Sequence, residues 1–253
     1  MISVVMAYYN RKLQLDYTLK TIRQSRVRDV EIVIVDDFSD DQNHLRDLAQ
    51  QWPDLTIRVI SLRDHFGQKK WCNPCVPYNI GLRACQGEFV VIQNPECCHM
   101  GDVLAHVEAH CSDGVYLSFH TYGCTKQDTQ ALHATGHFEM FSHAKKARWY
   151  NHEVERPVAF HFCNAITRTD LKKVNGFDER FALGHNWDDA ELLHRVRKIC
   201  TVKFVSDPWA VHQYHTKSYQ HPDNPMPTQD NKALYFQTVD ENIIRAPNQE
   251  SIT

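Results

Sequence analysis

The feature of this sequence that most constrains its fold is a series of short, β-branched apolar runs separated by segments that can form helices. The runs occupy residues 2–6, 31–35, 56–60, 89–92 and 115–119. The helix-compatible segments occupy residues 13–22, 40–51, 77–85 and 102–111. The runs lack polar alternation, which is typical of strands that helices cover on both sides. We therefore expect βαβ units and an α/β fold with a mostly parallel sheet and flanking helices.

The second half of the chain is less regular. We expect residues 120–160 to form loops and edge strands over one end of the sheet. The stretch WDDAELLHRVRK, residues 187–198, predicts a helix because acidic residues occupy its first turn and basic residues its last. We expect a final strand over residues 209–215, a last helix over 232–239 and a loosely ordered tail after residue 242.

Composition argues against several classes of protein. The 253 residues contain 28 Lys and Arg against 31 Asp and Glu, a net charge of −3 that gives no support for a nucleic-acid partner. No run approaches the ~20 apolar residues of a membrane span. The opening residues MISVVMAYYNRK lack the basic region and cleavage site of a signal peptide. We therefore expect a cytoplasmic protein whose nine cysteines are reduced.

In parallel α/β sheets, ligands bind beyond the carboxyl ends of the strands. This rule selects residues 7–10, 36–39 and 93–96, where polar side chains follow three of the apolar runs. Asp36 and Asp37 are adjacent carboxylates that can bind ribose hydroxyls or accept a hydrogen bond from a base N–H. The alternative is a structural role, because Asp and Ser residues in this pattern also cap helices.

Asn94-Pro95-Glu96 follows the fourth apolar run. An acidic residue here can hold a divalent cation on a diphosphate, because Mg²⁺ or Mn²⁺ neutralises the charge that a departing nucleoside diphosphate carries. A single Glu is a small ligand set, so the alternative is a proline-containing turn with a solvated Glu.

The predicted helix over residues 187–198 opens with Trp187, Asp188 and Asp189. An aspartate in a first helical turn can point into a cleft and accept a proton from a hydroxyl nucleophile. The alternative is that such an acid stabilises the helix dipole, and both roles can coexist.

Two histidines, His212 and His215, lie in the last predicted strand. Residues three apart on a strand face opposite sides, so we expect the strand to present only one of them to a metal. A single His is more often structural than a metal ligand.

The stretch Cys72-Asn73-Pro74-Cys75 has the spacing of a zinc or redox motif. No second such motif follows, and the adjacent Cys97 and Cys98 are poorly spaced for structural zinc. We expect buried free thiols, with a zinc-stabilised binding module as the alternative.

Four stretches of the chain, taken together and in order, resemble glycosyltransferase family 2 enzymes with the GT-A fold. ISVVMAYYNR is similar to the family's first strand and turn, and EIVIVDDFSDD to its second strand with the ending VDDGS. PYNIGLRACQGEFVVIQNPE is similar to ARNxGxxxAxGEYIxFLDxDD, and VNGFDERFALGHNWDDAELLHRV to GGFDE…ED.DL..R. The order and the separations agree over residues 2–215.

The resemblance implies roles on the donor side of a site. Ala7 and Tyr9 should lie against the nucleotide base. Asp37 should contact the uracil or ribose with Asp36 in support, and Asn79 matches the Asn of the family's donor-binding stretch.

The resemblance also implies roles in the chemistry. Asp189 matches the general base of the family's inverting mechanism, and Asp188 matches the preceding acid, which contacts the acceptor. Glu96 takes the place of the last acid of the DxD motif, the main metal ligand, and Asn94 takes that of the first. His212 resembles the downstream His that completes the metal site.

The chain departs from the family pattern near the donor. Because Asn94-Pro95-Glu96 replaces DxD, one formal charge is missing. Lys69 and Lys70 are candidates for neutralising the diphosphate, and the alternative is a solvated pair of loop charges. Tyr78 replaces the family's Arg before Asn79, which removes another possible phosphate contact.

The resemblance implies a GT-A domain over residues 1–215, with residues 216–253 as a loop and helix extension of it. The implied activity is inverting transfer of a hexose or N-acetylhexosamine from a nucleotide-sugar, which we take to be a UDP-sugar, to a glycan or glycoconjugate hydroxyl. Mn²⁺ or Mg²⁺ would bind the diphosphate. A catalytically inactive nucleotide-sugar binding protein is the alternative. The segment 216–228 is expected to order over the donor as a lid.

Overall fold

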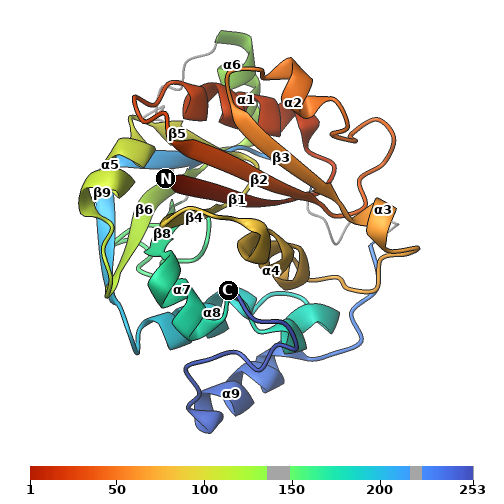
Figure 1. The fold of residues 1–253 in the computed structure, drawn as a ribbon, viewed down its shortest axis with the longest axis vertical. Helices are drawn as coiled ribbons and strands as arrows, with labels where there is room; N and C mark the ends of the chain where they lie inside the picture. The colour runs from red at the N-terminus through yellow and green to blue at the C-terminus, as the bar shows by residue number, and fades with distance from the viewer. Residues whose placement is uncertain (136–148, 217–223, 253) are drawn as a thin grey trace.

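The computed structural model describes residues 1–135, 149–216 and 224–252, which form a mixed sheet with helices on both faces (Figure 1). The strand order is β3-β2-β1-β4-β8-β6-β9-β5, and β7 pairs with β6. The strands are β1 Ile2–Tyr8, β2 Val30–Asp36, β3 Thr56–Ser61, β4 Phe89–Gln93, β5 Cys97–Met100, β6 Val115–Gly123, β7 Trp149–Asn151, β8 Cys163–Thr167 and β9 Thr201–His212. The helices are α1 Lys12–Arg23, α2 Leu48–Gln51, α3 Leu62–His65, α4 Cys75–Ala84, α5 Val103–His110, α6 Lys126–Thr135, α7 Arg168–Val174, α8 Asp188–Val196 and α9 Asn231–Glu241, with a 3₁₀ helix η1 over Glu179–Leu183. None of these helices has the length and apolar character needed to cross a membrane.

The first four strands form the parallel part of the sheet. β1 pairs in parallel with both β2 and β4, and β2 pairs in parallel with β3. Successive side chains of a strand point to opposite faces. Accordingly, Val4 packs in the core under α1 and α5, and Val5 in the core under α4, α7 and α8. Helix α4 approaches closely at Gly81, where a Cβ would lie 2.6 Å from a methyl group of Val5. Burial on both faces explains the continuous apolar runs.

The second part of the sheet is mixed in direction. β8 lies between β4 and β6 and is antiparallel to both. β6 and β9 are parallel, and β5 is antiparallel to β9. The α/β fold is therefore confirmed, but the sheet is mixed rather than mostly parallel, because four of its strand pairings are antiparallel and the parallel pairs are concentrated in β1 to β4. The sequence patterns did not predict β5, β8 or α6, because each of these elements carries polar residues at buried positions.

Two expected elements differ in extent. Only the end of the helix expected over residues 40–51 forms, as α2. Upstream of it, the carboxylate of Asp40 accepts hydrogen bonds from the main-chain N–H groups of Gln42 and Asn43 at 3.1 and 3.0 Å. This side chain satisfies the backbone locally and competes with a helix. The last strand ends at His212, three residues before the expected end.

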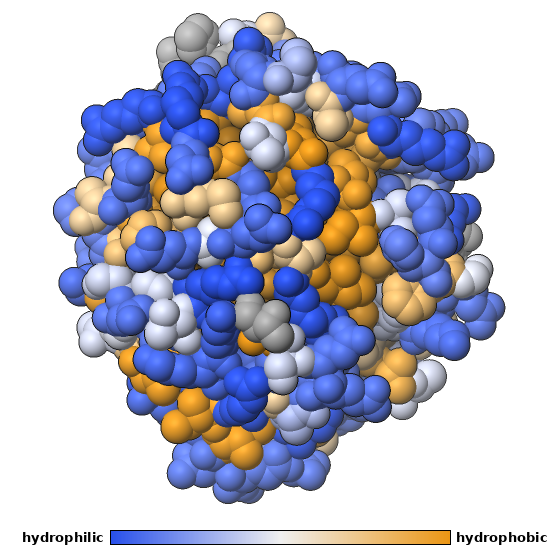
Figure 2. Space-filling model, viewed as in Figure 1, coloured by the Kyte–Doolittle hydropathy of each residue, from blue (hydrophilic) through white to orange (hydrophobic). Residues whose placement is uncertain are grey.

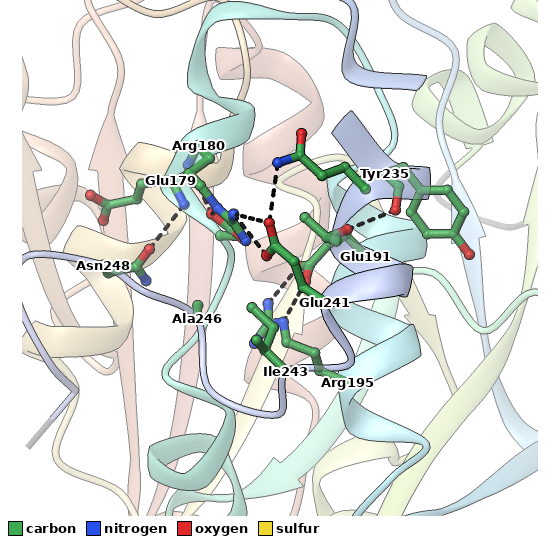
Figure 3. Close-up of polar contacts among 12 residues, drawn as sticks. Glu179, Arg180, Glu191, Arg195, Tyr235, Glu241, Ile243, Ala246 and Asn248 are labelled. Carbon is green, nitrogen blue, oxygen red and sulfur yellow. Dashed lines mark hydrogen bonds and ion pairs between the residues drawn. The ribbon is translucent and has the colours of Figure 1, made fainter. Parts of the chain in front are cut away.

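The chain after α9 is held against the rest of the protein, so the expectation of a loose tail is wrong. Asn248 donates hydrogen bonds to the main-chain oxygens of Asn175 and Phe177 at 2.9 and 2.7 Å. On α9 itself, Glu241 pairs with Arg180 at 3.0 Å (Figure 3). These polar contacts, together with the buried apolar side chain of Ile252, hold the C-terminal segment in place.

Apolar side chains reach the surface on the face seen in Figure 1 mainly beside β3 and α4, and again over α9 (Figure 2). Phe236 on α9 is 55% exposed, and Ile244 just after it is 44% exposed. Helix α9 therefore presents apolar side chains outward as well as inward.

Candidate active site

A cavity of about 780 Å³ opens at the carboxyl ends of β1, β2 and β4. Its wall contains most of the residues expected to form a site: Ala7, Tyr9, Asp37, Lys69, Asn94, Glu96, Asp188, Asp189 and His212. Parallel strands bring their carboxyl ends to the same edge of the sheet, and this is why residues far apart in the sequence meet here. The start of α8, the end of β9 and the chain before β8 also contribute to the wall.

Two expected site residues, Asp36 and Asn79, do not line this cavity. Asp36 accepts a hydrogen bond from the main-chain N–H of Ser39 at 3.0 Å, so it forms the turn after β2. Asn79 on α4 donates to the main-chain oxygen of Phe177 and to Oε1 of Glu179, both at 2.9 Å. Asn79 therefore ties α4 to the chain before η1, and the expected contact with a donor is not supported for either residue.

Asp37 is the centre of a small polar group at one end of the cavity. Its carboxylate pairs with Nζ of Lys69 at 2.7 Å and accepts a hydrogen bond from Nε1 of Trp71 at 2.8 Å. Burial raises the pKa of Asp37, and Lys69 and Trp71 oppose this effect. The ammonium group of Lys69 also lies 4.5 Å from the centre of the Tyr9 ring. Lys69 is thus paired, and Lys70 is exposed and outside the wall.

Glu96 is the centre of a largely buried cluster formed by Arg11 and two histidines. Arg11 donates from Nη1 to both carboxylate oxygens at 2.7 and 2.8 Å. The Nε2 atoms of His212 and His215 lie 3.0 and 3.1 Å from Oε1 of Glu96. Burial alone would raise the pKa of Glu96, but Arg11 and the two histidines hold it well below its usual range. One carboxylate oxygen and two imidazole nitrogens lie within 4.8 Å of one another, which suits a bound metal ion.

His215 and Arg11 were not expected to join this cluster. The alternation argument excluded His215 because it assumed a strand through residue 215, whereas β9 ends at His212. Beyond that point strand alternation no longer applies, and both histidines reach the same carboxylate oxygen. Arg11 lies one residue beyond the first of the three selected strand ends, so a slightly wider window would have included it.

Asn94 is held by Tyr78, the residue that stands where the family pattern has an Arg. The hydroxyl of Tyr78 donates to Oδ1 of Asn94 at 2.9 Å and approaches the main-chain oxygen of Gln93 at 3.0 Å. Tyr78 is 2% exposed and lies on α4 beside the cavity. Where the family has an Arg, this chain therefore has a hydroxyl that orients Asn94.

Asp188 is a buried acid at the first turn of α8. Its Oδ1 atom accepts a hydrogen bond from Nδ2 of Asn73 at 2.9 Å, while Oδ2 is buried without a partner in the described structure. Burial and the neighbouring Asp189 raise the pKa of Asp188 to about 6. The Cys72–Cys75 stretch thus contributes its Asn to the site. Its two cysteines are free and buried like the other seven, as expected.

Asp189 contacts His161, a residue that no sequence pattern identified. Nδ1 of His161 pairs with Oδ1 of Asp189. The imidazole is buried, and the rings of Tyr78 and Phe177 pack edge-on against it with centroids 4.7 and 4.9 Å away. Burial lowers the pKa of His161, but the two aspartates outweigh it, so its pKa is raised. His161 therefore fixes the orientation of Asp189 at the cavity wall.

The strand order, the two-sided helical cover and a cavity at the strand ends are those of a GT-A glycosyltransferase. A family model agrees: glycosyl transferase family 2 matches residues 3–174, and the chain belongs to this family. A search of curated proteins found no match.

Solved structures with the same fold share little sequence with this chain. TarS residues 1–349 from S. aureus align with a TM-score of 0.59 at 18% identity, over 84% of this chain and 60% of that one. The mannosyltransferase PcManGT from Pyrobaculum calidifontis, in complex with GDP-Man and Mn²⁺, gives 0.57 at 20% identity, over 86% and 58%. GalNAc-T7 with UDP, GalNAc and Mn²⁺ gives 0.64 at 15% identity, over 95% and 48%. This chain therefore spans only part of the length of each, and the likeness establishes the fold.

Proposed function

We propose that this protein transfers a sugar from a UDP-sugar to a hydroxyl of a glycan or glycoconjugate, with inversion at the anomeric carbon. The observation that carries the proposal is that two different clusters face one cavity. Both clusters have ligand atoms close enough together to hold an ion; we assign Glu96 with its two histidines to a cation on a diphosphate, and Asp188 and Asp189 with His161 to proton transfer. Membership of glycosyl transferase family 2 supports this division of roles.

The nucleoside would bind at the Asp37 end of the cavity. Ala7 and Tyr9 line the wall there, and Asp37 presents a carboxylate that can accept a hydrogen bond from a base N–H or a ribose hydroxyl. Lys69 and Trp71 already hold this carboxylate in place. Neighbours of the same fold were solved with UDP or GDP-Man, and this supports a nucleotide-sugar donor.

A divalent cation would be held by Glu96, His212 and His215, with Asn94 nearby. Carboxylate and imidazole ligands suit Mn²⁺ better than Mg²⁺, which prefers oxygen ligands. The cation would supply positive charge that stabilises the departing diphosphate. Because Arg11 already pairs with Glu96, a metal must compete with the guanidinium for this carboxylate.

Asp189 would act as the general base. The acceptor oxygen attacks the anomeric carbon while the bond to the diphosphate breaks, and the hydroxyl proton passes to Asp189. His161 holds Asp189 in position, and Asp188 would contact the acceptor. A general base at this step is typically worth about 10²–10⁴ in rate. The expected lid over residues 216–228 falls largely outside the described residues and carries no part of this proposal.

Release of UDP from a panel of UDP-sugars, with and without Mn²⁺, tests the proposal. We expect slow hydrolysis of one donor by the wild type and its loss in Asp189→Asn. If the wild type binds UDP but hydrolyses no donor, and transfers no sugar to any glycoside offered, the alternative of an inactive nucleotide-sugar binding protein is correct. Asp240→Asn, an exposed acid on α9, is the matched control.

A further inference from the structure

Trp187 occupies an unusual backbone conformation at the cavity wall. Its φ is 70°, and that of the preceding Asn186 is 57°, so both lie in the left-handed region. Bulky residues rarely adopt this conformation, and strain of this kind concentrates at binding sites. Glycine would fit here without strain, yet the chain places its largest side chain at this point, directly before Asp188 and Asp189.

The indole of Trp187 continues into an aromatic surface on α9. The centre of its ring lies 5.1 Å from that of Tyr235, with the planes inclined at 36°, and 6.2 Å from that of Phe236. Tyr235 is half-buried, while Phe236 is 55% exposed. The three rings therefore form a continuous apolar surface that runs from the cavity wall beside the two acids to the outside of the molecule. The exposed ring of Phe236 is one of the apolar side chains that α9 presents outward.

Helix α9 is fastened to the turn that carries Trp187. Nδ2 of Asn231, the first residue of α9, donates to the main-chain oxygens of Asn186 and Phe181, both at 3.0 Å. Asn231 is 2% exposed, and Asp230 caps the helix by accepting from the main-chain N–H of Lys232 at 3.0 Å. The relative position of the three rings is thus set by buried hydrogen bonds.

We propose that Trp187, Tyr235 and Phe236 form an acceptor subsite that receives a pyranose sugar on its apolar C–H face. The inference rests on the proposed function and names the acceptor class of the same site. A pyranose has a face of C–H bonds and a rim of hydroxyls, so a ring stacked on Trp187 can direct a rim hydroxyl toward Asp189.

The polar surroundings favour a sugar over a purely apolar acceptor. Oδ2 of Asp188 is buried in the wall next to Trp187 without a partner in the described structure. A buried carboxylate oxygen that stays unpaired is costly, and a rim hydroxyl would satisfy it. An alkyl chain on the same rings would leave it unpaired, so an occupant with hydroxyl groups beside its apolar face fits this wall better.

Saturation-transfer NMR with the protein saturated in UDP and Mn²⁺ tests this inference. The probes are methyl glycosides of glucose, galactose, mannose and N-acetylglucosamine, together with octyl β-glucoside. We expect strong saturation of protons on one face of at least one pyranose ring. In Phe236→Ala and Trp187→Gly, the latter compatible with the left-handed backbone, we expect dissociation constants at least five-fold higher. Ile244→Ala, an exposed apolar residue beyond α9, should bind as the wild type does.

Three results would overturn the subsite: no glycoside is saturated by the wild type, Phe236→Ala and Trp187→Gly bind glycosides unchanged, or saturation of octyl β-glucoside falls on the alkyl chain alone. Calorimetric titration with UDP separates this failure from that of the proposed function. If the wild type binds UDP but no glycoside, only the acceptor subsite is refuted. If it binds no UDP, the proposed function is refuted as well.

Discussion

Nη1 of Arg11 lies 2.7 and 2.8 Å from the two carboxylate oxygens of Glu96, so a single nitrogen of the guanidinium serves both. The side chain of Glu96 is 1% exposed, and that of Arg11 is 14% exposed. The candidate metal site therefore already contains a positively charged side chain, at one of its possible ligands. A metal bound to Glu96 would have to compete with the guanidinium of Arg11.

Arg11→Gln should lower the free energy of unfolding by about 3 kcal/mol, because removing one partner of a buried ion pair leaves the other charge uncompensated. Mn²⁺ should then stabilise the variant more than the wild type, since Glu96 no longer has to release the guanidinium. Urea unfolding with and without Mn²⁺ measures both effects. Arg26→Gln is the control, because its pair with Asp102 is exposed and 3.8 Å long, and it should cost less than about 1 kcal/mol. Equal Mn²⁺ effects on Arg11→Gln and the wild type would refute the competition.

Asp188→Asn should make the protein more stable above pH 6. The pKa of this acid is raised to about 6 in the folded state by burial and by Asp189. The folded state therefore holds a proton that the unfolded state releases near pH 4, and stability falls as pH rises between these values. An amide removes this dependence and can keep the hydrogen bond from Asn73. We expect a gain of about 1–3 kcal/mol at pH 7.5 and no gain at pH 4. Thermal unfolding of the variant and the wild type between pH 4 and pH 7.5 measures this difference in stability. A variant that is less stable than the wild type at pH 7.5 would contradict the prediction.

His161→Gln should destabilise the protein most at low pH. The pKa of His161 is raised in the folded state because Asp189 and Asp188 outweigh burial. A basic group whose pKa is raised on folding stabilises the protein fully at pH values below its ordinary pKa of about 6.5. This stabilisation is lost as pH rises through the raised pKa. We expect a cost of about 2 kcal/mol at pH 5.5 that shrinks toward pH 9. His65→Gln, an exposed His on α3, should show neither the cost nor its pH dependence. A cost that is constant across this range would mean that His161 acts by packing alone.

Asp189→Asn should reduce sugar transfer by about 10²–10⁴ while leaving the dissociation constant for UDP within about two-fold of wild type. The change removes a proton acceptor without altering the shape of the side chain. UDP binding should be little affected because Asp189 does not belong to the Glu96 cluster that would hold the cation. Initial rates and calorimetric titration on the same preparation separate the two quantities. Activity within a few-fold of wild type would show that another group accepts the proton.

The sequence predicted the strands that helices cover on both faces and that polar residues follow. Residues 2–6 and 31–35 are apolar throughout because helices cover both faces of β1 and β2, so their pattern could be read directly. The same reasoning placed Asp37 and Glu96 at one edge of the sheet. It did not predict β8, because the buried polar Asn164 interrupts the short apolar run of that strand.

The residues that sequence reasoning missed act through tertiary contacts alone. His161 belongs to no motif and becomes meaningful only because Tyr78, Phe177 and Asp189 surround it. His215 was excluded by strand alternation, which stops applying once β9 ends at His212. Asn79 matched a family position, yet its amide is used to join α4 to the chain before η1.

Calorimetric titration of the protein with UDP, with and without Mn²⁺, tests the central claim most directly. We expect Mn²⁺ to strengthen UDP binding at least ten-fold in the wild type. His215→Ala should lose most of this effect, whereas His65→Ala should keep it. UDP binding that is independent of Mn²⁺ in both the wild type and His215→Ala would contradict the assignment of Glu96, His212 and His215 as the cation site.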